Sequence, residues 1–203
     1  MSKTKPAGAV EPKRHRGRVR VAAIMDAGVE VFLEKGFDAA TMTEIAARSD
    51  TAIGSLYRFF PSKEALADAL LLEYTEHVMS ELSSLEKRAS SMELQAVGDA
   101  LVEFMFSLQS KRALAIGLIE GRADREGERS EFRDAMRAGI ARILRKAIPT
   151  VTLAKSRVAA IVLLHILKAA AGVSRAPSAM QQSLLSEIRK LLSAYLHSLA
   201  SNT

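Results

Sequence analysis

Residues 41–66, TMTEIAARSDTAIGSLYRFFPSKEAL, constrain the fold of this chain more than any other stretch. Thr41 is followed three residues later by Glu44, which is the capping-box pattern that begins a helix. A connection of about three residues leads to a second short helix, in which Leu56 and Phe60 are four residues apart and share a buried face. Two short helices joined by so tight a turn predict a helix-turn-helix.

The second short helix is expected to expose small, hydroxyl, aromatic and cationic side chains: Ile53, Gly54, Ser55, Tyr57 and Arg58. Such side chains suit a helix end in a major groove, where bulk would prevent close approach. Pro61 is predicted to end this helix because its ring lacks an amide donor, and Ser62 to begin the next one as its N-cap. Lys63 then lies in a first helical turn, which favours a bound phosphate.

With Gly36-Phe37 ahead of it, this stretch resembles the DNA-binding domain of the TetR family of bacterial transcriptional regulators. The most specific part is Leu56-Tyr57, Phe60 and Ser62-Lys63-Glu64-Ala65-Leu66, close to the family's LYxxFxSKEAL run. The resemblance covers roughly residues 18–72. It implies a helical N-terminal DNA reader and a helical C-terminal domain that binds a ligand and dimerises.

The chain departs from the family pattern in two places. The family usually has Gly-Val-Ser in the turn, whereas this chain has Asp50-Thr51-Ala52, so Thr51 or Asp50 is expected to cap the second helix. Ile53 stands where the family often has lysine, and it could meet a thymine methyl group instead. The predicted DNA-binding residues are Arg18, Thr41, Thr43, Thr51, Ala52, Ile53, Gly54, Ser55, Tyr57, Arg58 and Lys63.

The positive charge of the chain is concentrated at its N-terminus. Residues 1–20 hold seven cations and one acid, so their net charge of +6 equals that of all 203 residues. A basic tail taken alone is as readily a solubilising disordered arm, but beside a helix-turn-helix it favours an arm that binds phosphates or the minor groove. We therefore expect a flexible arm at 1–17, a DNA-binding domain at 18–66 and an effector-binding and dimerisation domain at 67–203.

Periodicity beyond the helix-turn-helix is helical throughout, with no run of strand period and no internal repeat. Helices are expected at about 19–35, 62–85, 92–109, 114–119 and 153–171, with others before Pro149 and at the C-terminus. The predicted fold class is all-α, with an N-terminal three-helix reader and a C-terminal helical domain.

Composition and motifs give no sign of catalysis, metal or membrane. The chain has no cysteine, which excludes disulfides and fits a cytoplasmic protein, and no signal peptide is expected. The most apolar run, 158–173, contains His165 and Lys168 and is too short to span a bilayer. No GxSxG, Gly-rich phosphate loop or HExxH occurs, so no enzyme, cofactor or metal is predicted. Asp99 and Glu103 share a helix face, which is typical of a solvated surface and less often of paired catalytic carboxylates.

The C-terminal half is predicted to supply a dimer interface and an effector pocket. The last two helices carry more apolar residues than a monomer surface needs, although both could simply be core. Predicted interface residues are Leu163, Ile166, Leu184, Ile188, Leu191, Leu192 and Tyr195. Core packing accounts equally well for the candidate pocket residues, whose functional assignment rests on the family resemblance: Phe104, Met105, Ile116, Glu120, Met136 and Ile140.

The resemblance thus implies a homodimeric regulator of double-stranded operator DNA, most simply a repressor released by a small apolar or amphipathic effector. Alternatives within the same class are a regulator without a ligand and an activator. The alternative from another class is a small all-α enzyme, which turnover without DNA affinity would reveal.

Overall fold

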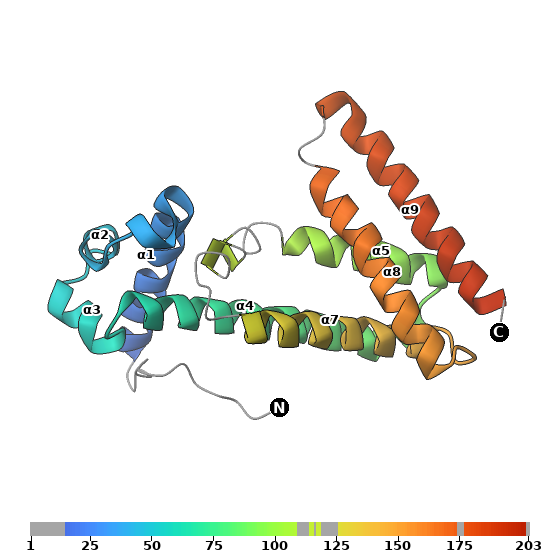
Figure 1. The fold of residues 1–203 in the computed structure, drawn as a ribbon, viewed down its shortest axis with the longest axis horizontal. Coiled ribbons are helices and arrows are strands. Elements are labelled where there is room, and N and C mark those ends of the chain that lie inside the picture. The colour runs from blue at the N-terminus through green and yellow to red at the C-terminus, as the bar shows by residue number, and fades with distance from the viewer. Residues whose placement is uncertain (1–14, 109–113, 116, 119–125, 174–176, 202–203) are drawn as a thin grey trace. The chain divides into compact units, whose positions relative to one another are not determined.

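The computed structural model describes residues 15–108, 114–115, 117–118, 126–173 and 177–201, and all the regular secondary structure among them is helical (Figure 1). The all-α prediction is confirmed. In chain order the elements are α1 (His15–Ala39), α2 (Met42–Arg48), α3 (Ile53–Phe59), α4 (Lys63–Arg88), the 3₁₀ turn η1 (Ala89–Ser91), α5 (Leu94–Ser107), α7 (Glu126–Ala147), α8 (Leu153–Gly172) and α9 (Ser178–Ser201). No described helix is long and apolar enough to cross a membrane.

The chain divides into two compact units. The first comprises the described residues among 1–76 and 110–127, and the second those among 77–109 and 128–203. Helix α4 is continuous over 26 residues and contributes to both, so the domain boundary expected after residue 66 falls inside a helix. Helix α1 begins at His15, which makes the last three residues of the expected flexible arm helical.

Local sequence signals account for most helix ends in the first unit. Gly36 has φ +77°, a left-handed value that glycine adopts without strain, and it interrupts α1 one residue after the predicted end. Helix α3 ends before Pro61, and the Ser62 hydroxyl accepts from the Ala65 amide at 3.2 Å at the start of α4. The predictions for Pro61 and Ser62 are confirmed.

In the second unit α5, α8 and α9 pack against one another. The unit also includes α7 from residue 128 and the part of α4 that follows residue 76. Leu192 of α9 is fully buried, and Gly98 of α5 lies so close that a Cβ there would be 3.8 Å from the Leu192 Cβ. Arg189 of α9 donates to Glu103 at 2.7 Å and lies 3.6 Å from Asp99. The two carboxylates on α5 thus form surface ion pairs with one arginine, which is the ordinary role expected for them.

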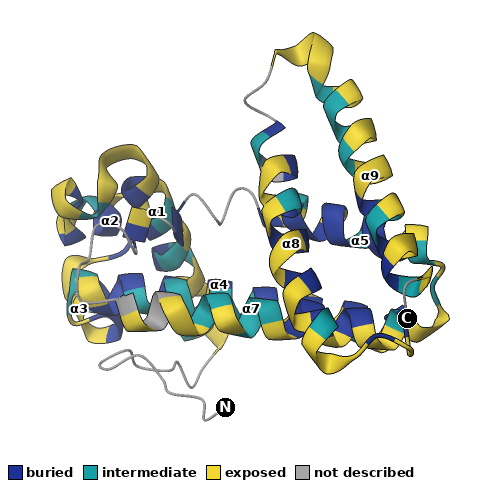
Figure 2. Ribbon diagram, turned by 45° about the vertical axis from the view of Figure 1, so that its right-hand side comes forward, coloured by how far each residue is buried: buried dark blue, intermediate teal, exposed yellow. Residues whose placement is uncertain are grey.

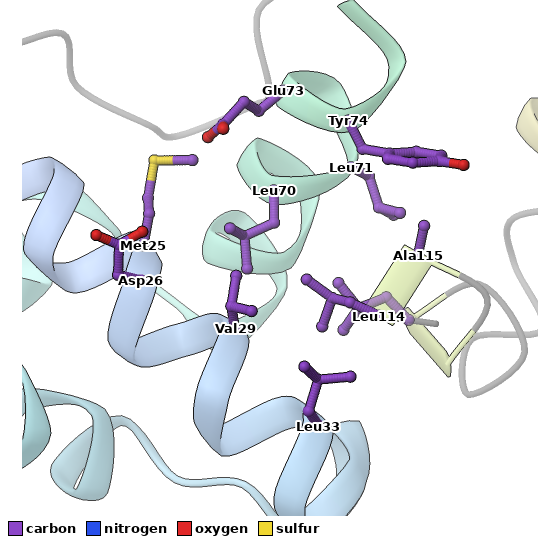
Figure 3. A pocket seen from close by; sticks show the side chains of 11 residues that line it. Met25, Asp26, Val29, Leu33, Leu70, Leu71, Glu73, Tyr74, Leu114 and Ala115 are labelled. Atoms are coloured by element: carbon purple, nitrogen blue, oxygen red, sulfur yellow. The ribbon is translucent and has the colours of Figure 1, made fainter. Parts of the chain in front are cut away.

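Leu114 and Leu118 contribute to the first unit although they lie far along the chain. Leu114 and Leu118 are buried in the same apolar cluster as the core of α1, α2 and α3. They also line a cavity of about 250 Å³ with α1 and α4 (Figure 3).

Candidate nucleic-acid interface

The helix-turn-helix begins with the predicted capping box. The Thr41 hydroxyl accepts from the Glu44 amide at 3.3 Å, and the Glu44 carboxylate accepts from the Thr41 amide at 3.2 Å. The Thr41 hydroxyl also donates to that carboxylate at 2.9 Å. Two amides that the helix itself cannot satisfy are paired in this way, so the first turn of α2 has a fixed direction.

The turn between α2 and α3 differs from its prediction. Asp50 has φ +46°, in the left-handed region where the family usually has glycine, and aspartate tolerates this conformation better than most residues. Thr51 is buried and its hydroxyl donates to the Ser49 carbonyl at 3.1 Å. The N-cap of α3 is Ala52, which has no side-chain cap. The prediction that Thr51 or Asp50 caps α3 is wrong, because the Thr51 hydroxyl bonds to the Ser49 carbonyl within the turn instead of to an amide of α3. Thr51 is also buried, so it does not belong to the exposed face.

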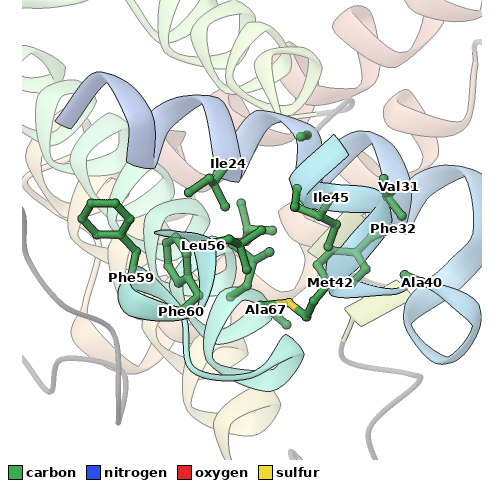
Figure 4. Packing of buried hydrophobic residues seen from close by; sticks show 14 of the residues in the cluster. Ile24, Val31, Phe32, Ala40, Met42, Ile45, Leu56, Phe59, Phe60 and Ala67 are labelled. Carbon is green, nitrogen blue, oxygen red and sulfur yellow. The ribbon is translucent and has the colours of Figure 1, made fainter. Parts of the chain in front are cut away.

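An apolar core fixes α2 and α3 against α1 (Figure 4). Ile24 of α1, Ile45 of α2 and Leu56 of α3 are all fully buried. Helix α1 approaches α4 closely at Gly28, where a Cβ would lie 3.0 Å from the Leu66 Cδ2. Burying a side chain the size of isoleucine or leucine stabilises the fold by about 1.5–3 kcal/mol, so this core is sufficient to hold the two short helices rigidly.

Ion pairs on the surface join α1 to α2. The Arg48 guanidinium donates to both carboxylate oxygens of Glu34, at 2.6 and 2.8 Å, and the Lys35 ammonium donates to Glu44. Hydrogen bonding to Arg48 lowers the pKa of Glu34 below its usual value, and hydrogen bonds from Lys35 and then Thr41 lower the pKa of Glu44. Both carboxylates are therefore charged at neutral pH and keep the bidentate and capping geometry intact.

Lys63 holds the start of α4 against the end of α1. Its ammonium group donates to the carbonyls of Asp38 and Ala40, at 2.9 and 3.0 Å, and lies 4.6 Å from the centroid of the Phe37 ring. A lysine has three donors, so at most one remains for a phosphate. These contacts brace two segments of the first unit, and the phosphate contact expected from the sequence stays a prediction.

The exposed side of α3 presents most of the side chains expected there. Ile53 and Tyr57 are 41% and 47% exposed, and Gly54 and Arg58 are also exposed. Ser55 differs, because its hydroxyl oxygen is buried and has no hydrogen-bond partner among the described residues. The expectation that Ser55 exposes its hydroxyl is therefore wrong.

The remaining predicted contacts are exposed residues of α1, α2 and the two helix N-caps. Ala52, Thr41 and Thr43 are exposed next to or within α2 and α3, and Arg18 is exposed in the first turns of α1. Arg16 and Arg20 are exposed in the same turns of α1, so three cations lie within five residues there. The sequence signal for this group was only the charge of the N-terminal segment, most of which lies outside the described residues.

A sequence profile described as "Bacterial regulatory proteins, tetR family" matches residues 24–70, which is the unit just described from α1 into α4. The A-factor receptor protein of Streptomyces griseus is 34% identical over 87 residues, covering 43% of this chain and 29% of that protein. Over residues 24–70 the chain is therefore similar to the DNA-binding region of the TetR family. The HTH-type transcriptional repressor DhaR of a Mycobacterium species is 30% identical over 124 residues, or 59% of this chain and 57% of the repressor. The chain thus spans less than two thirds of the length of these relatives.

Solved structures extend the likeness to the whole fold. A crystal structure described as a TetR-family transcriptional regulator from Mesorhizobium loti superimposes with a TM-score of 0.70 at 18% identity, covering 90% of this chain and 98% of that one. FadR of Bacillus subtilis, solved in complex with stearoyl-CoA, gives a TM-score of 0.63 at 19% identity, covering 85% and 97%. At these identities the likeness shows a shared helical fold.

Burial divides the predicted dimer-interface residues of the second unit (Figure 2). Leu163 and Leu192 are fully buried within the single chain, so they are core residues and we correct their assignment to a surface interface. Leu191 is 54% exposed, and the other predicted interface residues are half-buried: Ile166, Leu184, Ile188 and Tyr195. Sequence reasoning missed the apolar residues that α8 exposes at helical spacing: Val158, Ile161 and Val162.

The predicted effector residues are not gathered into a described cavity. Phe104, Met105 and Ile140 are buried and Met136 is half-buried in the second unit, while Ile116 and Glu120 lie outside the described residues. Two cavities of the first unit are lined by other residues, so the effector assignment in the second unit stays a prediction. No group of three or more potential metal ligands occurs among the residues the structure describes. His165 is exposed, with Nδ1 2.7 Å from the Ile161 carbonyl, so it is a helix-surface histidine.

Proposed function

We propose that this protein is a transcriptional regulator that binds double-stranded operator DNA through α2 and α3. The observation that carries the proposal is the exposed face of α3, where Ile53, Gly54, Tyr57 and Arg58 stand on a rigid core immediately after a capped, tightly turned α2. A helix positioned in this way can enter a major groove, where base edges present distinct patterns of donors and acceptors.

The side chains of this face fall into reading and positioning groups. Arg58 is suited to bidentate contact with a guanine edge, and Ile53 to contact with a thymine methyl group. The Tyr57 hydroxyl and the Thr43 hydroxyl can donate to phosphates, which fix the register of the protein on DNA without reading sequence. Arg18 and its neighbouring arginines, together with the basic segment at 1–17, would add sequence-independent affinity.

The proposed regulator acts as a homodimer through α8 and α9. Val158, Ile161, Val162 and His165 follow the i, i+3, i+4, i+7 spacing of one helix face, and the first three are 62%, 41% and 38% exposed. Leu191 supplies an exposed apolar residue on α9. An apolar stripe of this kind on a surface is typical of a protein interface, and two helices per subunit meeting their symmetry mates would bury it.

Repression with release by a small apolar or amphipathic effector is the regulatory mode we propose. DhaR carries the name of a repressor and FadR was solved with stearoyl-CoA, which are properties of those two proteins. Helix α4 starts at the helix-turn-helix and continues into the second unit, so a change in its course would reach both. Activation, or regulation without an effector, would use the same DNA-binding face.

Fluorescence anisotropy with labelled duplex DNA tests the proposal. DNA from the region flanking the protein's own gene is compared with unrelated DNA of equal length, at one salt concentration, because non-specific binding depends steeply on salt. We expect selective binding of a flanking segment, and a weakened selectivity in Arg58→Ala, by roughly 1–3 kcal/mol if this arginine bonds a guanine. Equal affinity for all duplexes would contradict the proposal.

A further inference from the structure

The first unit contains a cavity of about 250 Å³ between α1, α4 and the later residues Leu114, Ala115 and Leu118 (Figure 3). Apolar side chains form most of its wall, with Met25, Val29 and Leu33 from α1, Leu70 from α4, and Leu114 and Leu118 from the later segment. A second hollow of about 230 Å³ shares Leu33, Leu114 and Leu118 with it. Apolar cavities of this kind hold apolar ligands in preference to water.

The volume limits what the cavity can accept. An apolar cavity of about 150 Å³ holds benzene, and pockets for drug-sized ligands begin at about 300 Å³. A cavity of about 250 Å³ therefore fits a molecule of one or two rings, or a short branched chain. A long acyl chain such as that of stearoyl-CoA is too large for it.

The polar groups of the wall determine the charge of the ligand. Asp26, Glu73 and Tyr74 are the polar residues of the described lining, which contains no cation among the residues that the structure describes. In the view of Figure 3, Asp26 and Glu73 lie at the same end as Met25, while Leu114 and Ala115 lie at the other. Asp26 is exposed and has no hydrogen bond or ion pair among the described residues, whereas Glu73 already has a partner. One end of the cavity is thus acidic and the rest is apolar.

We propose that this cavity binds a small hydrophobic cation. The apolar body of the ligand would lie among Val29, Leu70 and Leu114, and its ammonium group would lie beside Asp26. A cation in this position gains a charge-assisted contact at the solvent-facing end while its rings leave water. An anion would be repelled by this carboxylate, and a neutral molecule of the same shape would lack the attraction between opposite charges.

The cavity borders the apolar core that supports the helix-turn-helix, because Leu70, Leu114 and Leu118 belong to both. Met25, Val29 and Leu33 line it at successive turns, while Ile24 and Val31 are buried in the core shared with α2 and α3. If the protein binds an operator as proposed above, ligand binding in this cavity would change the operator affinity through α1 by about fivefold or more. The same coupling would make operator DNA change ligand affinity by the same factor.

Titration calorimetry of the full-length protein without DNA tests the site, so its outcome does not depend on whether the protein binds an operator. The probes are 1-naphthylmethylamine, which is an ammonium ion at neutral pH, and the neutral 1-naphthalenemethanol of nearly the same shape. We expect the amine to bind once per chain, about threefold or more tighter than the alcohol, which is what a partly exposed charge pair contributes. Asp26→Asn should remove this preference without weakening the alcohol.

Two further variants separate the cavity from other surfaces. Glu81→Gln removes an exposed carboxylate of α4 that lies outside the cavity, and it should leave both affinities unchanged. Ala115→Phe places a ring in the cavity and should abolish binding of both probes. Absence of amine binding, equal affinity of the two probes for the unsubstituted protein, or an Asp26→Asn variant that keeps the preference would overturn the proposal.

Discussion

Replacing Lys63 with methionine tests whether this residue is a structural brace or a phosphate contact. Methionine keeps an apolar stem of similar length but removes the ammonium group that donates to Asp38 and Ala40 and lies over Phe37. The side chain is partly exposed, so each hydrogen bond contributes near the low end of its range, about 0.5–1 kcal/mol. The contact with the ring adds about 0.5–1 kcal/mol, giving a loss of about 2 kcal/mol.

The loss should be local to the first unit, because all three partners of Lys63 lie there. Hydrogen exchange followed by mass spectrometry resolves it, since each segment reports its own opening free energy. A loss of about 2 kcal/mol corresponds to about thirtyfold faster exchange in the peptides at the end of α1 and the start of α2. Peptides of α8 and α9 serve as an internal reference and should not change.

A matched control is Arg20→Met, which removes an exposed cation from α1 that has no interaction among the described residues. Exchange in this variant should match the unsubstituted protein. The reasoning would be refuted if Lys63→Met also exchanged normally and instead lowered the slope of log K against log salt for operator binding by about 0.9, which is the signature of one lost phosphate contact.

Three further outcomes follow from the geometry. Asp50→Gly should stabilise the first unit by about 0.5–1 kcal/mol. Glycine adopts φ +46° without a Cβ clash, and this gain exceeds the extra chain entropy that glycine loses on folding. Exchange protection that does not rise would argue against strain at this turn. The lowered pKa of Glu34 means that its pair with Arg48 stabilises the folded chain at neutral pH and that this contribution disappears as the pH falls through the folded-state pKa. Arg48→Met should therefore make α1–α2 protection less dependent on acid pH, and an identical pH profile would count against the pair. Leu191→Glu should give folded monomers in sedimentation, whereas Leu192→Glu should lose helicity because it buries an unpaired carboxylate; a Leu191→Glu dimer would place the interface elsewhere.

The helix ends of the helix-turn-helix were predictable where they depend on residues close together in the sequence. The capping box of Thr41 and Glu44, the end of α3 before Pro61 and the cap at Ser62 all depend on residues within a few positions of each other. The role of Lys63 was not predictable, because the carbonyls that it binds lie 23 and 25 residues earlier and carry no sequence signal.

The burial of individual side chains could not be predicted from the sequence either. Thr51 and Ser55 suit an exposed helix start by residue type, but Thr51 is buried with its hydroxyl bonded to the Ser49 carbonyl, and the Ser55 hydroxyl oxygen is also buried. Helices α8 and α9 are rich in apolar residues, so periodicity could not separate buried Leu192 from exposed Leu191. Leu191 and Leu192 are the same residue type, and only the packing of α9 in three dimensions buries one and exposes the other.

Selection from a pool of randomised duplex DNA by the full-length protein tests the central claim most directly. We expect enrichment of one motif by the unsubstituted protein, and a changed base preference at one position of that motif with Arg58→Ala. Because the proposed dimer presents two copies of α3, the motif should contain two related half-sites with centres about 34–36 Å apart, or a multiple of that distance. A pool that remains random after repeated rounds, with binding that depends only on salt, would contradict the claim that α3 reads DNA sequence.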